Sequence, residues 1–269
     1  MCKIQIYNED CFSVMTRIPT GHIKLTVTSP PYDNLRTYNG NTSWNYTKFQ
    51  SIAKELYRIT AEGGVVVWIV SDQTIAGSET GTSFRQALFF KECGFNLHDT
   101  MIWKKTKILP RDTRIPRYWQ AFEYMFILSK GKPDHFTFLR ERTKYSGLQT
   151  TAYSRNPDGS LRYDRRDKTV KHIVNDTKPL CNVWEINNPS MKGHPATFPE
   201  KLAENHILSW SYKDDTVFDP FMGSGTTGIS CIKNNRNFIG TEIDKNYFEL
   251  AKQRIEQAKM NKETEENTK

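Results

Sequence analysis

The sequence predicts an α/β fold, a doubly wound and mostly parallel sheet that carries a small insert. Apolar, β-branched runs alternate along the chain with segments in which apolar residues recur at helical spacing. Two of these runs are followed directly by proline or glycine turns, at the edge where sheets of this class bind ligands. With 269 residues, 37% of them hydrophobic, the chain is long enough for one large domain and an insert.

Each element follows from the spacing of its apolar residues and from the turn that ends it. The run at 65–70 has the composition of a strand buried on both faces, and Gly63 and Gly64 are expected to end the helix before it. The predicted strands lie at 3–7, 23–28, 65–70, 98–103, 122–128, 216–218 and 237–243. The predicted helices lie at 11–17, 44–61, 83–92, 199–209, 226–234 and 245–259. Because strands and helices alternate, the sheet should be mostly parallel, with helices on both faces.

The periodic pattern fails between residue 132 and about residue 183, where the chain is polar, charged and rich in turns. A structureless loop of this length is uncommon inside a compact domain, so we expect a small insert domain at 131–185. The insert separates one half of the sheet-forming chain, 1–130, from the other half, 186–259. A polar tail at 260–269 is expected to fray.

The net charge of +8 is concentrated in one region. Residues 104–171 contain 17 Lys or Arg and 7 Asp or Glu, so the rest of the chain is close to neutral. Aromatic residues are interleaved with these cations, which favours contact with a nucleic acid over an ordinary solvated basic face. The cations that we expect to contact nucleic acid are Arg36, Arg111, Arg114, Arg117, Arg140, Arg142, Lys144, Arg165 and Arg166.

Other classes of protein are disfavoured. No apolar run approaches the roughly 20 residues that span a bilayer, and the first residues lack the plan of a secretion signal, so we expect a cytoplasmic protein without a membrane partner. The five cysteines form no CxxC pair and no histidines cluster beside them, which favours core thiols and no metal site.

A glycine loop follows the predicted strand at 216–218 directly. Gly223 and Gly225 allow the backbone to approach a ligand closely at this edge of the sheet. Glu242 ends the next strand about 20 residues later, where a carboxylate accepts the ribose hydroxyls of an adenosine-containing ligand. An alternative role for Glu242 is to cap the following helix, although Asp244 is better placed for it. The loop residues expected to bind the ligand are Asp219, Phe221, Gly223, Ser224, Gly225 and Thr226.

A proline turn, Ser29-Pro30-Pro31-Tyr32, follows the predicted strand at 23–28. The prolines lack N–H donors, so carbonyl oxygens and the Ser29 hydroxyl form an array of acceptors. Such an array suits the exocyclic amine of a flipped base, with Tyr32 stacked on the ring. Two accepted hydrogen bonds would localise the lone pair of the amine for attack on a methyl group. Taken alone, the two prolines are better explained as a rigid exit from a strand.

Together the two motifs resemble those of the DNA amino-methyltransferases. Residues 28–32 are similar to their catalytic S-P-P-Y motif, and residues 219–227 to their D-P-F-x-G-S-G-T cofactor loop. Residues 8–11 resemble the acidic motif beside the cofactor adenine, and residues 194–199 the H-P-A-x-F-P segment beside the methionine moiety. By this resemblance Asp10, Cys11, Thr197 and Phe198 also bind the cofactor, S-adenosylmethionine.

The order of the motifs is that of the β group, in which the target-recognition region lies between the catalytic and cofactor halves. The resemblance therefore implies a seven-stranded sheet with one antiparallel strand, base flipping, and target recognition by the insert at 131–185. It implies double-stranded DNA as partner and an origin in a restriction–modification system with a cognate endonuclease. A homodimer is expected only by analogy. The loop at 33–40, with Arg36, is predicted to cover the catalytic turn.

The base that is methylated is predicted from one side chain. Adenine-N6 enzymes of this group usually carry Asp or Asn at the first position of the catalytic motif, whereas this chain has Ser29, so N4 of cytosine is preferred. Methylation of N6 of adenine is the alternative. The basic insert argues against a small-molecule substrate, RNA remains a further alternative, and the two intact motifs disfavour a non-catalytic binding module.

Overall fold

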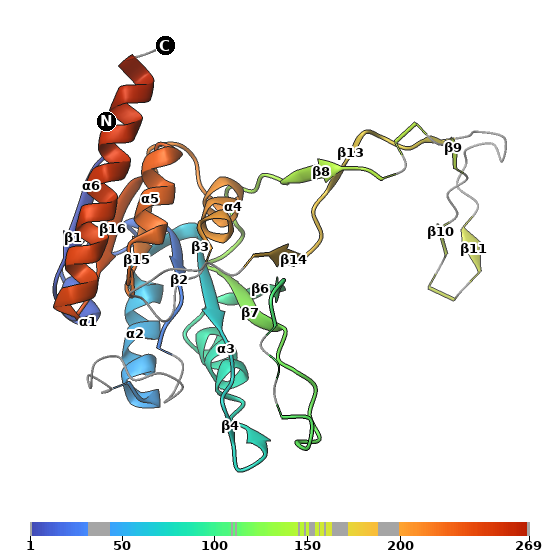
Figure 1. Cartoon of the computed structure of the whole chain (residues 1–269), viewed down its shortest axis with the longest axis horizontal. Coiled ribbons are helices and arrows are strands. Elements are labelled where there is room, and N and C mark those ends of the chain that lie inside the picture. Colours follow the sequence, from blue (N-terminus) through green and yellow to red (C-terminus); the bar gives the residue numbers. More distant parts are fainter. Residues whose placement is uncertain are drawn as a thin grey trace. The chain divides into compact units, whose positions relative to one another are not determined.

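The computed structural model describes two compact units of the chain (Figure 1), one formed by Met1–Thr137 and Asn182–Lys269, the other by Phe138–Cys181. The described residues are 2–31, 44–108, 110, 112–144, 146–147, 149–150, 154–155, 157–158, 160–162, 172–187 and 199–267. The second unit lies within the limits of the predicted insert, 131–185.

The first unit is built on an eight-stranded sheet with the order β1-β16-β15-β2-β3-β7-β6-β14. All neighbouring strands are parallel except for the two pairs that involve β7, so β7 alone is reversed. The strands are β1 (Ile4–Tyr7), β2 (Ile23–Thr28), β3 (Thr60–Val70), β6 (Asn96–Lys105), β7 (Phe122–Ser129), β14 (Val183–Ile186), β15 (Thr216–Asp219) and β16 (Asn237–Thr241). A separate hairpin joins β4 (Thr74–Ile75) and β5 (Ser78–Glu79).

The strand β14 makes the sheet one strand larger than the seven expected. It pairs in parallel with β6, and Trp184 lies opposite Trp103. The sequence did not suggest this strand because only four residues form it and exposed residues alternate with more buried ones. Such a short edge strand depends on its neighbour for stability, so local periodicity predicts it poorly.

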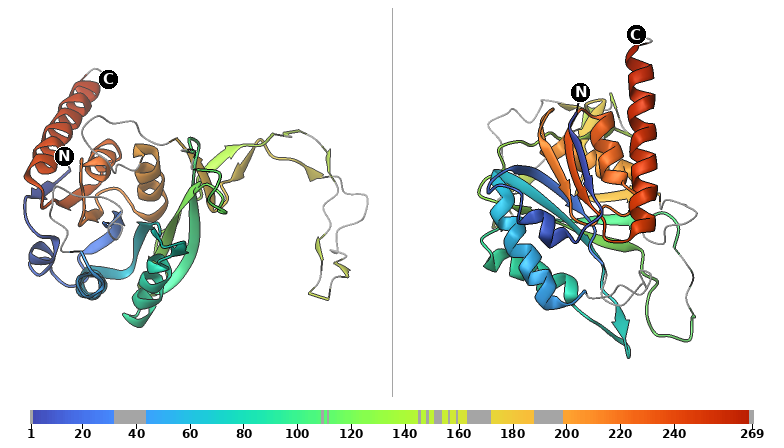
Figure 2. Two further views of the ribbon diagram at one scale, coloured as in Figure 1. Left: turned by 60° about the horizontal axis from the view of Figure 1, so that its bottom comes forward. Right: turned by 90° about the vertical axis from the view of Figure 1, so that its left-hand side faces the viewer.

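Helices cover both faces of the sheet, as expected (Figure 2). Helices α1, α2 and α3 pack in sequence on one face, while α4, α5 and α6 pack on the other. Their bounds are α1 (Cys11–Met15), α2 (Tyr46–Ile59), α3 (Thr82–Glu92), α4 (Glu200–Trp210), α5 (Thr226–Lys233) and α6 (Lys245–Asn267). This arrangement is the doubly wound fold that the sequence predicted.

Two predicted boundaries were wrong. Gly63 and Gly64 lie inside β3 rather than at the end of α2, because Gly63 adopts a φ of 72° and its N–H donates to the Lys130 carbonyl at 2.8 Å. Helix α6 continues through the tail that was expected to fray. Its last turns are rich in strong helix formers, and the Lys262 ammonium donates to the Ile232 carbonyl in the last turn of α5.

The core on the α1–α3 face is rich in aromatic rings. Phe49 of α2, Trp68 of β3 and Phe90 of α3 are fully buried and meet at centroid distances of 5.1–5.8 Å. Edge-to-face contacts of this kind add to the stabilisation from burial alone. The face of the sheet that α1–α3 cover therefore has a closely packed aromatic core.

The second unit consists of short antiparallel ladders. Strand β8 pairs with β13, β9 with β12, and β10 with β11. Their bounds are β8 (Arg140–Arg142), β9 (Gln149–Thr150), β10 (Ser154–Arg155), β11 (Leu161–Arg162), β12 (His172–Ile173) and β13 (Thr177–Pro179).

Candidate active site

The predicted catalytic turn and the predicted glycine loop leave adjacent strands at the same edge of the sheet. β2 ends at Thr28 and β15 ends at Asp219, and the two strands pair in parallel, with Phe218 opposite Thr26. On the other side of β15, Asp219 lies opposite Gly240 of β16. Residues more than 190 positions apart in the sequence are thereby brought together.

The Asp219 carboxylate joins the two motifs. One oxygen accepts the hydroxyl of Thr28 at 2.7 Å and the Phe221 amide at 3.1 Å, and the other accepts the hydroxyl of Thr227 at 2.7 Å. Thr28 immediately precedes the catalytic turn, whereas Thr227 lies in α5 after the glycine loop. The carboxylate is buried, so it fixes the position of both motifs from beneath. The sequence had assigned Asp219 to the cofactor directly; the structure places its side chain inside the protein.

Burial raises the pKa of Asp219 to about 6, although the hydrogen bonds from Thr227, Thr28 and the Phe221 amide act in the opposite direction. Desolvation disfavours the charged form of a carboxylate, and here it outweighs three donors. The nearby charge of Glu242 raises the pKa further. The junction between the motifs therefore carries a group that titrates just below neutral pH.

Glu242 lies where the sequence predicted a ribose-binding carboxylate. It accepts the Gly223 amide at 3.0 Å and the Asp244 amide at 2.9 Å, one on each oxygen. Burial raises the pKa of Glu242, and the two amides oppose that shift. A carboxylate has about four acceptor positions, so positions remain for a ligand's hydroxyl groups. The helix cap assigned as its alternative role is made by Asp244, which accepts the Asn246 and Tyr247 amides.

The conformation of the loop requires glycine at both positions. Gly223 and Gly225 have φ values of 50° and 80°, which other residues rarely adopt. A Cβ on Gly225 would also lie 3.2 Å from atoms of Ala251 and Ile255, so α5 and α6 could not approach as closely. The side chains of Ser224 and Thr226 are buried beside this turn.

Of the remaining residues predicted to bind the cofactor or the base, two are described by the structure and three are not. Asp10 caps α1 by accepting the Phe12 amide at 2.9 Å and forms an ion pair with Lys48 at 2.8 Å. The Cys11 side chain is buried in the core, and burial raises its pKa to about 12, so only its backbone can reach a ligand. Three predicted site residues, Tyr32, Thr197 and Phe198, lie outside the described residues.

The family model described as DNA methylase, of N6 and N4 methyltransferases, matches residues 23–253. The chain belongs to this DNA methylase family. The orphan methyltransferase M.BamHII of Bacillus amyloliquefaciens is 53% identical over 247 residues, which cover 87% of this chain and 88% of the relative. The type II methyltransferase M.Cfr9I of Citrobacter freundii is 24% identical over 291 residues, covering 93% and 87%.

Solved structures show the same fold. The complex of M1.HpyAVI with S-adenosylmethionine (SAM) has a TM-score of 0.60 and 26% identity, covering 93% of this chain and 99% of that one. The PvuII DNA methyltransferase, described as cytosine-N4-specific, has a TM-score of 0.69 and 22% identity, covering 94% and 86%. The chain is thus a SAM-dependent DNA methyltransferase, and the donors and acceptors around Gly223 and Glu242 fit that cofactor.

In this DNA methylase, most of the described cations predicted to contact DNA are already engaged. Arg114 binds Asp112, and Arg117 donates to Glu79 at 2.8 Å and to the Gly77 carbonyl. In the second unit, Arg140 donates to the hydroxyl and carbonyl oxygens of one threonine of β13, whereas Arg142 and Lys144 are exposed. The other predicted DNA contacts, Arg36, Arg111, Arg165 and Arg166, lie outside the described residues.

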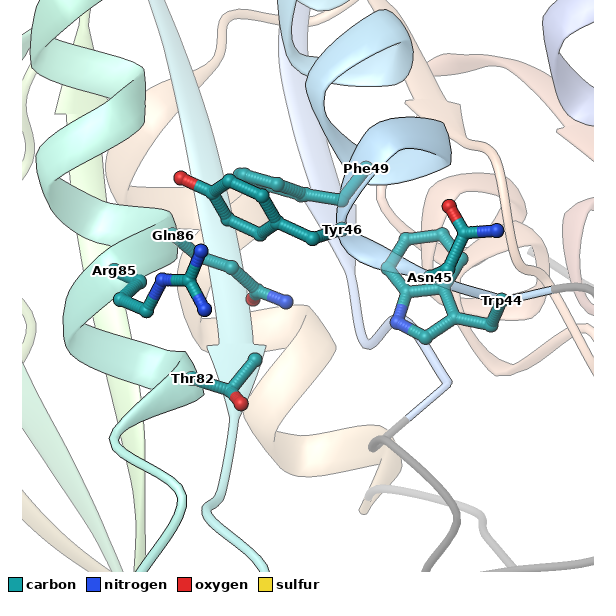
Figure 3. A pocket seen from close by; sticks show the side chains of 7 residues that line it. All are labelled: Trp44, Asn45, Tyr46, Phe49, Thr82, Arg85 and Gln86. Carbon is teal, nitrogen blue, oxygen red and sulfur yellow. The ribbon is translucent and has the colours of Figure 1, made fainter.

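A pocket that the sequence did not predict lies between the first turns of α2 and α3 (Figure 3). It has a volume of about 220 Å³. Its lining residues are Trp44, Asn45, Tyr46, Phe49, Thr82, Arg85 and Gln86. The two groups of residues are separated by a whole strand and hairpin, so only the strand order brings them together.

Neither a metal site nor a membrane span appears in the part of the chain that the structure describes. No group of three or more His, Cys, Asp or Glu residues there could hold a metal ion. No described helix is both long and apolar enough to cross a bilayer.

Proposed function

We propose that the chain is a site-specific methyltransferase for the N4 amine of cytosine in double-stranded DNA. One observation carries the proposal: the Asp219 carboxylate holds the residue before the Ser29-Pro30-Pro31 turn and the helix after the glycine loop in one network. This network supports the proposal because it connects the turn that we expect to hold the base amine with the loop that we expect to bind the methyl donor. Ser29, at the first position of the motif, favours cytosine N4 over adenine N6.

Catalysis in this proposal is mainly orientation. SAM, when bound, supplies the methyl group. The Ser29 hydroxyl and the Pro30 carbonyl accept the two N–H groups of the base amine, which directs its lone pair out of the plane of the base. Tyr32 stacks on the flipped base, and the loop at 33–40 excludes water.

The DNA itself is held by more than the catalytic turn. We propose that the insert at 131–185 recognises the target sequence and that its cations neutralise phosphates. The relatives M.Cfr9I and M.SmaI are described as type II methyltransferases, which supports an origin in a restriction–modification system, whereas M.BamHII is described as an orphan methyltransferase. A cognate endonuclease and a homodimer remain parts of the proposal that purification of the complex would test.

The decisive experiment identifies the methylated base. DNA from cells that express the chain is digested to nucleosides and analysed by mass spectrometry, with cells expressing Ser29→Ala as the control. We expect N4-methylcytosine with the parent protein and none with the variant. A sample that contains only N6-methyladenine would refute the choice of cytosine, and modified RNA with unmodified DNA would refute the DNA substrate.

A further inference from the structure

The pocket between α2 and α3 lies at the same edge of the sheet as the catalytic turn. Its two helices follow β2 and β3, so their first turns lie at the carboxyl ends of those strands. Trp44 lines the pocket and also packs edge-to-face on Phe221 of the cofactor loop, with ring centroids 5.3 Å apart. A substrate held at the catalytic turn would therefore extend next to this pocket.

The amide side chains in the pocket present hydrogen-bond donors. Gln86 is 2% exposed, and its carbonyl oxygen accepts the indole N–H of Trp68 at 2.8 Å. Because that indole can only donate, the Gln86 oxygen must face it, and the NH₂ group faces the pocket. The Asn45 oxygen accepts the Lys48 amide at 2.9 Å, which likewise leaves its NH₂ group available.

Arg85 adds a positive charge to these donors. Its guanidinium stacks on the ring of Tyr46, 4.1 Å from the centroid, and Figure 3 shows the two side chains next to each other. Stacking occupies one face of the guanidinium and leaves the N–H groups at its edge available for an oxyanion. Within the described part of the chain, no carboxylate pairs with Arg85, in contrast to Arg114 and Arg117.

From this geometry we infer that the pocket binds a phosphodiester group of the DNA backbone next to the methylated base. Arg85 provides the charge, and the amides of Gln86 and Asn45 and the hydroxyl of Thr82 provide further donors. The guanidinium and the two NH₂ groups can only donate, and the Thr82 hydroxyl can donate as well as accept, so these groups suit an acceptor, and the cation selects an anionic one. Such a contact fixes the register of the duplex without reading its sequence. The inference rests on the proposed function, because it takes DNA as the substrate.

Salt dependence of binding tests this site. Affinity for a fluorescent duplex that contains the mapped target site is measured from 50 to 200 mM salt for the parent protein, Arg85→Ala, Arg85→Lys and Lys252→Ala. Lys252 is the matched control, since it is exposed on α6, on the opposite face of the sheet. Loss of one phosphate contact should reduce the slope of log K against log salt by about 0.9.

The ratio of the parent protein's affinity to that of Arg85→Ala should therefore be largest at 50 mM salt. Between 50 and 200 mM salt this ratio should fall roughly 3.5-fold. Arg85→Lys should keep the slope of the parent protein, because the charge is retained, while binding more weakly. Lys252→Ala should behave as the parent protein does. A slope for Arg85→Ala equal to that of the Lys252→Ala control would overturn the inference.

Neutral methylphosphonate groups, placed one at a time around the target base, identify the phosphate. One position should weaken binding by the parent protein and have no effect on Arg85→Ala. If no position distinguishes the two proteins, or if Arg85→Ala changes only the affinity for SAM, the pocket does not hold DNA. A parent protein that leaves DNA unmodified would instead refute the proposed function, so the two failures are distinguishable.

Discussion

Asp219→Asn should change how the stability of the protein depends on pH. Burial raises the pKa of Asp219 from 3.8 to about 6 in the folded protein, so between these values the folded state binds a proton that the unfolded state has lost. The free energy of unfolding therefore falls as pH rises through this interval. The difference between the two pKa values corresponds to roughly 3 kcal/mol at pH 7.

The asparagine variant can keep most of the hydrogen bonds. Its carbonyl oxygen can accept from Thr28 and from the Phe221 amide, and its NH₂ group can donate to the Thr227 hydroxyl. Without a titrating group, it should not show the loss of stability between pH 4 and pH 7. Relative to the parent protein, the variant should gain up to ~3 kcal/mol across that range.

Urea denaturation of both proteins at pH 4, 5, 6 and 7, followed by fluorescence and circular dichroism, measures this difference. Thr227→Val is a second variant within the same network. It removes a donor that lowers the pKa of Asp219, so its pH-dependent loss of stability should move to higher pH. A stability difference between Asp219→Asn and the parent protein that is constant from pH 4 to pH 7 would refute the reasoning.

Three further predictions concern single residues. Ser29→Ala should reduce methyl transfer at least ~100-fold and leave the Kd for SAM unchanged, as measured by calorimetry, because the hydroxyl acts on the base; normal turnover would rule out the acceptor array. Glu242→Gln should weaken SAM binding by about tenfold, through loss of charge-assisted hydrogen bonds to hydroxyl groups, and equal affinity by calorimetry would contradict that role. Gly225→Ala should destabilise the fold by about 1–3 kcal/mol, because it combines a φ of 80° with a crowded Cβ; an unchanged Tm would show that α5 and α6 can move apart.

Most of the sheet could be predicted from the sequence because its strands are apolar and β-branched and end at recognisable turns. The prediction placed the Ser29 turn and the Gly223 loop at strand ends, and the structure brings those ends together. The limits of α6 and the glycine pair inside β3 were missed. In both places contacts with distant segments, such as that of Lys262 with the Ile232 carbonyl, override the local signal.

The inner layer of the site was not accessible from the sequence. Nothing local to Thr28 indicates that its hydroxyl bonds to a carboxylate 191 residues away. The pocket at Arg85 depends in the same way on two helices that become neighbours only when β2 and β3 pair. Sequence motifs predicted which groups should face the ligands, whereas the groups that hold these motifs in place became evident only in the three-dimensional arrangement.

The pairing of β1 with β16 has a consequence for synthesis of the protein. Ile4 lies opposite Phe238, so β1 remains without this partner strand until more than 230 further residues have been synthesised. Similarly, the Thr28 hydroxyl lacks the carboxylate to which it donates until Asp219 has been synthesised. A nascent chain that stops before residue 219 can display the catalytic turn but cannot lock it in place. Methyl transfer should therefore begin only after Asp219 and β16 have been synthesised, and chains that stop before them should be inactive toward DNA.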